Sequence, residues 1–185
     1  MRRGAASETL RSVTPLLLAA ALSLSAAPKS PDAGVAFVPV TVLDVIELED
    51  GAWAVLLGEQ GADTVLPIFI GPLEGLAIRL RLDKQVTPRP LTADLLEDAI
   101  EALGGTVVRV DIDDLKADTF LGRITLRPKS GKPVVLDARP SDSIALALGT
   151  GAPIHVARSV LDSAGLSRKT LKSKPKGPGP KTESL

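Results

Sequence analysis

The sequence predicts an α+β fold, with one domain built on a mixed β-sheet and about four helices. Segments rich in β-branched residues come in blocks, and helical segments separate these blocks instead of following each strand in turn. The chain has 185 residues, of which 44% are apolar and 24% charged. Such a chain can bury a hydrophobic core, and its length leaves little room for a second domain.

The first block predicts three strands. The first begins at Phe37, and Glu49-Asp50-Gly51 forms a turn before Trp53–Leu57 returns as its hairpin partner. The third covers Thr64–Ile70. Because Pro67 has no N–H to donate to a ladder, we expect this strand to lie at an edge or to carry a bulge.

Two helices follow. Pro72 is tolerated in the first turn of a helix, so Gly71-Pro72 begins the first one. The second runs from Thr92, a suitable N-cap, to about Leu103, before Gly104. Apolar residues recur at helical spacing in both and are expected to face the core: Leu73, Leu76, Ala77 and Leu80 in the first helix, and Leu95, Leu96, Ala99, Ile100 and Leu103 in the second.

The remaining segments complete the sheet and add two helices. The predicted strands are Thr106–Ile112, Thr119–Arg127, Pro133–Ala138 and Pro153–Ala157. The helix expected over Ser141–Leu148 is apolar on all sides and is therefore predicted to be buried. A last helix ends near Gly165.

The formal net charge of zero hides basic ends around an acidic centre. Residues 31–166 hold 12 basic and 20 acidic side chains, a net charge of −8. We expect residues 1–27 to be a signal peptide, since a basic start precedes a short apolar run and small residues. The run is shorter than the roughly 20 residues of a membrane span, so the exported protein, periplasmic or extracellular, should have no transmembrane span once the signal is removed.

The rest of the chain divides into three parts. Residues 28–36 are a linker, 37–166 the folded domain, and 167–185 a disordered basic tail. The tail either attaches the domain to nucleic acid or an anionic surface, or it serves as a solubilising end. The acidic domain alone repels a polyanion unless metal ions or the tail intervene.

Composition excludes several kinds of site. Without cysteine there is no disulfide, thiol nucleophile or thiolate metal site. A single histidine, His155, rules out centres that need two imidazoles from one chain, and it is expected at a packed or surface position. With three phenylalanines, one tryptophan and no tyrosine, binding of single strands by stacking on aromatic side chains is not expected.

Charged residues gather where three predicted helices begin. Asp137–Asp142 joins a strand to the buried helix, Pro88–Asp94 precedes the second helix, and Glu74 lies in the first turn of the first. These starts can converge into one cluster of carboxylates and arginines. The cluster is either a salt-bridge network that orients the helices or a site for Mg²⁺ or Mn²⁺ with arginines that hold phosphate.

These segments resemble the bifunctional nuclease domain family. The motifs that carry the resemblance are Leu66-Pro67-Ile68-Phe69-Ile70-Gly71 with Glu74, Arg89-Pro90-Leu91-Thr92-Ala93-Asp94-Leu95-Leu96, and Asp137-Ala138-Arg139-Pro140-Ser141-Asp142-Ser143-Ile144-Ala145-Leu146-Ala147. The resemblance covers about Val38 to Gly165. It implies an α+β domain that self-associates, and a nuclease activity attributed to some plant members on DNA and RNA.

We therefore expect a metal-dependent nuclease. The expected catalytic residues are Asp137, Asp142 and Arg139; the expected substrate contacts are Arg89, Thr92 and Ser141; and Mg²⁺ or Mn²⁺ would be held by Glu74, Asp94, Asp137 and Asp142. The family usually has a histidine where this chain has Ala93. If that imidazole is the base or a metal ligand, activity is reduced here. The alternative is a non-catalytic, oligomeric binding or scaffold module of the cell envelope.

Overall fold

The computed structural model describes residues 34–49 and 51–172. The expected signal peptide, most of the linker and the end of the basic tail lie outside these residues. The elements in chain order are β1 (Phe37–Glu47), β2 (Trp53–Glu59), β3 (Thr64–Ile70), α1 (Pro72–Leu82), α2 (Thr92–Ala102), β4 (Thr106–Lys116), β5 (Thr119–Arg127), β6 (Val134–Ala138), α3 (Pro140–Thr150), β7 (Ile154–Ala157), α4 (Arg158–Ala164), β8 (Leu166–Ser167) and α5 (Arg168–Lys172).

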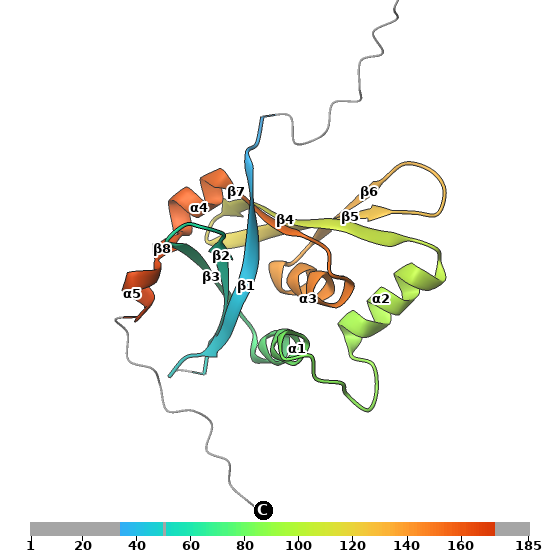
Figure 1. Cartoon of the computed structure of the whole chain (residues 1–185), viewed down its shortest axis with the longest axis horizontal. Coiled ribbons are helices and arrows are strands. Elements are labelled where there is room, and N and C mark those ends of the chain that lie inside the picture. The colour runs from blue at the N-terminus through green and yellow to red at the C-terminus, as the bar shows by residue number, and fades with distance from the viewer. Residues whose placement is uncertain (1–33, 50, 173–185) are drawn as a thin grey trace, which may run out of the picture. The chain divides into compact units, whose positions relative to one another are not determined.

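The strands form one sheet in the order β6-β5-β4-β7-β1-β2-β3-β8. Only β4 and β7 are parallel neighbours among these strands, so the sheet is mixed and the predicted α+β class is confirmed. Helices α1, α2 and α3 gather on one side of it (Figure 1), where α3 contacts β4 and β5 as well as both other helices. None of the described helices is long and apolar enough to cross a bilayer.

Strand β3 explains how the sheet accommodates a proline. It pairs with β2 from Val65 to Ile70, whereas β8 pairs only with Thr64 and Val65. Pro67 therefore lies where the second side of β3 is open, which is a place where a residue without an N–H is tolerated. β8 is the outermost strand, so the edge expected for β3 exists only beyond Val65, in the part of the strand that contains Pro67.

The domain continues past the end expected from the sequence. Residues 167–172 were assigned to the tail, but they complete β8 and form α5, a fifth helix in the described chain. The Arg168 N–H donates to the Asp63 carbonyl at 2.9 Å, and the Ser167 hydroxyl donates to the Asp63 carboxylate at 2.6 Å. Asp63 precedes Ser167 by 104 residues, and local periodicity does not reveal so distant a partner.

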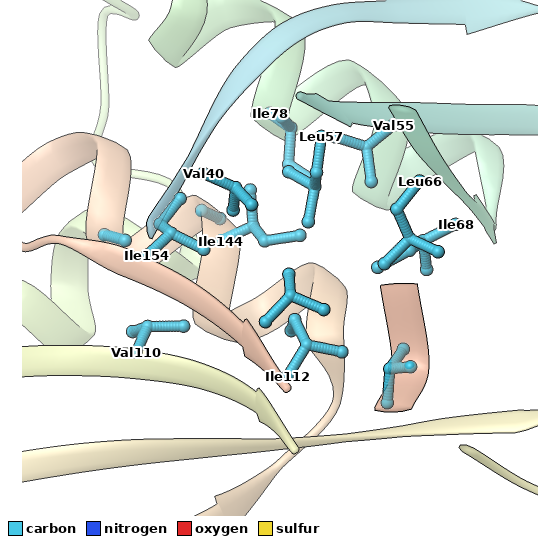
Figure 2. Close-up of a cluster of buried hydrophobic side chains, with 14 of the residues drawn as sticks. Val40, Val55, Leu57, Leu66, Ile68, Ile78, Val110, Ile112, Ile144 and Ile154 are labelled. Carbon is cyan, nitrogen blue, oxygen red and sulfur yellow. The ribbon is translucent and has the colours of Figure 1, made fainter. Parts of the chain in front are cut away.

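Helix α3 forms the centre of the core, as its all-apolar sequence predicts. Ile144 and Leu146 are fully buried and belong to the core cluster. Figure 2 shows Ile144 among side chains from the sheet. Val110 and Ile112 on β4 belong to the same cluster. Gly151 ends the helix at a φ of 70°, a conformation that glycine adopts without steric cost.

The apolar stripe predicted for α1 is wrong. Leu73 is 79% exposed and Leu76 is also exposed, whereas Gly75 and Ile78 are the buried residues of this helix. A Cβ at Gly75 would collide with the ring of Trp53, so the helix approaches β2 through its glycine. This close approach turns the leucines outward.

The stripe predicted for α2 is wrong except at Ile100, which packs against the core. No residue of α2 is buried, and Leu95, Leu96 and Leu103 are exposed. The helix contacts the core only through half-buried Ala93 and Ile100, because it lies on α3 rather than on the sheet. Periodicity alone does not show that two adjacent helices both keep leucines on the surface.

Candidate functional site

Arg139 joins the first turns of α1 and α3. Its Nη1 donates to Glu74 Oε1 at 2.9 Å, and its Nε and Nη2 donate to the two Asp142 oxygens at 2.7 and 3.0 Å. A planar guanidinium binds a carboxylate with particular geometric specificity in this two-bond arrangement. Two of the predicted acidic residues, 68 positions apart by their numbers, thus meet at one cation.

The local sequence favours this meeting. Pro72 and Pro140 each occupy the first helical position, so Gly71 and Arg139 are the extended N-caps. Gly71 has no Cβ, and the Glu74 carboxylate occupies the space that one would fill. The acidic residues also lie at the positive ends of their helix dipoles, which favours their ionised form.

The structure corrects the predicted start of α3 at Ser141 and the predicted N-cap of α2 at Thr92. Ser141 lies inside the first turn of α3 and is buried, and the cap is Arg139. Thr92 is the first residue of α2, and Leu91 precedes it as the cap. The Leu91 N–H instead donates to the Asp94 carboxylate at 2.7 Å, so an acid in the first turn replaces the hydroxyl.

The charges around Arg139 keep it protonated. The hydrogen bond and charge of Asp142, followed by those of Glu74, raise the pKa of Arg139 above its usual range. The guanidinium remains 65% exposed while it binds both acids. A permanently charged, accessible guanidinium is the group that binds phosphate oxygens best.

A pocket of about 380 Å³ lies beside Arg139. Its wall is made by the end of β3, the start of α1, the β4–β5 turn and the start of α3, with these residues: Ile68, Phe69, Ile70, Gly71, Glu74, Asp118, Thr119, Phe120, Arg139, Pro140 and Ser141. Ala117 and Asp118 both have positive φ, at 45° and 60°, as in a two-residue type I′ hairpin. This turn brings the Asp118 carboxylate to the pocket.

Arg81 organises a second charged cluster. Its guanidinium donates to Asp94 at 2.5 Å, to Glu97 at 3.2 Å and to the Ala145 carbonyl at 2.8 Å. The side chain is only 10% exposed, and a Cβ at Gly149 would collide with it. This cluster links α1, α2 and α3, so the predicted metal ligand Asp94 is part of the helix-orienting network.

Arg89 and Thr92 do not lie on the wall of the Arg139 pocket. Both are exposed, and the Arg89 carbonyl accepts a hydrogen bond from the Thr87 hydroxyl at 2.6 Å. The structure therefore brings only Ser141, among the three expected substrate contacts, to this pocket.

Asp137 lies in a different row of residues. It is opposite Arg123 on β5, Arg123 is opposite Asp111 on β4, and Asp111 is opposite His155 on β7. Residues in register share one face of a sheet, and the neighbours Val110 and Ile112 of Asp111 face the core. This outer-face row, Asp137, Arg123, Asp111 and His155, is therefore on the side away from α3.

His155 is half-buried in the outer-face row. Its Nδ1 lies 3.8 Å from Asp111 Oδ1, and the same oxygen accepts a hydrogen bond from Arg109 Nε at 2.8 Å. Burial, followed by the charge of Arg109, lowers the pKa of His155 below 6.5, and Asp111 opposes the shift. The imidazole is thus held mainly neutral near pH 7, and its half-buried place on β7 agrees with the packed or surface position expected from the sequence.

The four predicted metal ligands divide among three places. Glu74 and Asp142 meet at Arg139, Asp94 binds Arg81, and Asp137 belongs to the outer-face row. The single convergent cluster expected from the sequence is not formed. Within residues 34–49 and 51–172, no three acidic or histidine side chains are grouped so that they would hold a metal ion.

Sequence reasoning missed four residues of these sites. Arg81 received no role from the sequence, because it stands beside Arg79 in the last turn of α1 and nothing local shows that it is the arginine with acidic partners on α2. Phe69, Asp118 and Phe120 reach the pocket through the sheet topology. The short Lys116–Thr119 segment between two strands was the one local signal for Asp118.

Comparison with known proteins identifies the family. The model of the bifunctional nuclease domain matches residues 55–169, which include β3, all three helix starts and the outer-face row. This chain belongs to the bifunctional nuclease domain family. The match covers both charged clusters, so the Arg139 and Arg81 sites are part of the family's domain.

Relatives with this domain include bacterial and plant proteins. An uncharacterized protein of Mycobacterium tuberculosis is 44% identical over 111 residues, which are 60% of this chain and 65% of that protein. Bifunctional nuclease 1 of Oryza sativa is 29% identical over 127 residues, 66% of this chain and 38% of the rice protein. The chain thus matches less than two thirds of the length of each of these relatives.

Proposed function

We propose that this bifunctional nuclease domain cleaves phosphodiester bonds of nucleic acid at the Arg139 pocket. The observation that carries the proposal is the accessible guanidinium of Arg139, held by two carboxylates beside a pocket of about 380 Å³. The names of the rice relatives support the reaction class. A pocket of this volume is within the range of small-molecule sites.

Arg139 would orient and neutralise the scissile phosphate. Its Nη1 and Nη2 now donate to Glu74 and Asp142, and a phosphate can take over one of these donors because the side chain is exposed. Released from Arg139, Glu74 becomes a carboxylate that can accept a proton from an attacking water. Asp142 keeps the guanidinium in position through Nε.

A divalent cation fits this acidic surrounding. Glu74, Asp118 and Asp142 outnumber Arg139, and an excess of carboxylates attracts a cation before an anionic substrate. Mg²⁺ is often held by one or two carboxylates with water and phosphate, so Glu74 and Asp142 would hold it together with the phosphate of the substrate and not by themselves. Bound Mg²⁺ or Mn²⁺ would supply charge neutralisation and an activated water.

The place of Ala93 in the structure shows whether the histidine usual in the family would lie at the proposed site. Ala93 is half-buried on α2 next to Asp94, which binds Arg81, and it is not part of the Arg139 pocket wall. In our proposal the chemistry at Arg139 therefore needs no imidazole at position 93.

A cleavage assay on the full chain tests the proposal. Labelled single- and double-stranded DNA and RNA are incubated with Mg²⁺, Mn²⁺ or a chelator, with Glu74→Gln beside the wild type. Glu97→Gln is the matched control, since Glu97 is also a helix carboxylate bound to an arginine, but at Arg81. We expect metal-dependent cleavage that Glu74→Gln abolishes and Glu97→Gln retains. Intact substrates under all conditions would refute the proposal.

A second candidate function is a non-catalytic, self-associating binding module. The observation that favours it is the exposure of leucines on α1 and α2, among them Leu73 and Leu103. Exposed apolar surface of this kind often marks an interaction site. Light scattering after gel filtration tests this candidate: a monomer at all concentrations would exclude it, and a stable oligomer whose wild type cleaves nothing would favour it.

A further inference from the structure

Two of the few aromatic residues of this chain meet at the Arg139 pocket. The sequence contains three phenylalanines and one tryptophan, and Phe69 and Phe120 both line the pocket. They come from β3 and β5, and four strands, β4, β7, β1 and β2, lie between these two in the sheet. The fold therefore concentrates aromatic surface that the composition alone made look negligible.

The two rings differ in their surroundings. Phe120 is partly buried and packs against the core, so its position is fixed by the fold. Phe69 is 66% exposed and does not belong to the core cluster. A phenylalanine ring that stays in water forgoes the large stabilisation of burial. Packing in the core therefore does not account for a phenylalanine at position 69.

The charged and polar groups of the same pocket suit a nucleotide. Arg139 provides the cation for a phosphate, while Thr119 and Ser141 provide hydroxyl groups. A base inside a duplex keeps its faces stacked on its neighbours and cannot present them to a protein ring, whereas an unpaired base can. The pocket volume of about 380 Å³ admits small groups and not a double helix.

We infer that the Arg139 pocket binds an unpaired base of single-stranded nucleic acid, which stacks on Phe69 and Phe120 while Arg139 holds the adjoining phosphate. The inference rests on the proposed nuclease function and specifies its substrate class. It makes single strands, loops and frayed ends the substrates, and perfect duplexes poor ones. It also replaces the expectation, based on composition, that aromatic stacking plays no part.

The test measures binding separately from cleavage. Fluorescence anisotropy of the full chain is recorded with a short labelled single strand, its duplex, and an abasic strand of the same length and charge. Ca²⁺ replaces Mg²⁺, and a gel shows that the strands stay intact. Phe69→Leu removes the ring while leaving an apolar side chain. Phe37→Leu is the matched control, because Phe37 on β1 lies under Arg109 and Arg123 and outside the pocket.

Stacking on one aromatic side chain changes affinity by about five- to 100-fold. We expect wild type and Phe37→Leu to bind the normal strand at least about fivefold more tightly than the abasic strand and the duplex. Phe69→Leu should bind normal and abasic strands alike, and Phe120→Leu should do the same if it remains folded. Equal binding of normal and abasic strands by the wild type would overturn the inference, as would an effect of Phe37→Leu equal to that of Phe69→Leu.

The two proposals fail in distinguishable ways. Selective binding of the normal strand without cleavage in Mg²⁺ or Mn²⁺ would keep the base pocket and refute the nuclease. Metal-dependent cleavage by a protein that does not discriminate normal from abasic strands would keep the nuclease and refute the base pocket.

Discussion

Replacing Arg139 and Arg81 by glutamine separates a functional arginine from a structural one. Each guanidinium binds two carboxylates on helices, so the two variants are chemically matched. They differ in exposure, since the Arg139 side chain is 65% exposed and the Arg81 side chain 10%. Solvent therefore screens the ion pairs of Arg139 more than those of Arg81.

The expected losses of stability follow from this difference. Exposed ion pairs contribute about 0.2–1 kcal/mol each, so Arg139→Gln should lower the free energy of unfolding by about 0.5–1.5 kcal/mol. Arg81→Gln removes two charge-assisted bonds and the donor to the Ala145 carbonyl, and should cost about 2–4 kcal/mol. In a chain of this length these values correspond to losses in Tm of roughly 1–6 °C and 4–16 °C.

Urea and thermal unfolding followed by circular dichroism measure both variants. The expected order is wild type, then Arg139→Gln close below it, then Arg81→Gln far below. If Arg139→Gln lost as much stability as Arg81→Gln, Arg139 would be a structural residue, and the view that it is free to bind phosphate would be refuted.

Three further predictions follow from the structure. Burial and the charge of Arg109 lower the pKa of His155 below 6.5, so below about pH 6.5 the unfolded chain binds more protons than the folded one. The free energy of unfolding is therefore full above about pH 6.5 and falls as the pH drops toward the lowered pKa. His155→Gln should remove this fall, measured as urea midpoints against pH, and a variant with the same pH profile as the wild type would contradict the prediction. Gly75→Ala should lower stability by about 1–3 kcal/mol and shift the emission of Trp53, the single tryptophan, because a Cβ collides with its ring; unchanged emission and stability would show that the contact is loose. Ala93→His should leave the cleavage rate unchanged, because position 93 is outside the pocket wall. A gain of tenfold or more would indicate that the reaction takes place at α2 and not at the Arg139 pocket.

The sequence predicted the order and class of the elements well. β-Branched runs, Gly-Pro starts and glycine ends are local signals, and they located the strands, the first three helices and the buried α3. The same signals failed for the faces of α1 and α2. Which side of a helix faces the core depends on what lies beside it, here Trp53 against Gly75 for one helix and α3 for the other.

The candidate site was predicted in part. Acids in the first turn of a predicted helix were a sound signal, and Glu74 and Asp142 do meet at Arg139. Asp137 and Asp94 went elsewhere because strand alternation turns one to the outer face and Arg81 draws the other to its own cluster. Phe69 and Phe120 could not be paired from the sequence, since the chain topology alone brings their strands to one pocket.

The most direct test of the central claim is the rate at which the full chain and Arg139→Gln cleave a labelled single strand in Mg²⁺ or Mn²⁺. Loss of one group that stabilises developing charge lowers catalytic rates by about 10²–10³-fold. The account predicts metal-dependent cleavage by the wild type and a loss of that size in a variant that remains folded. Equal rates for the two proteins, or no cleavage by either, would contradict it.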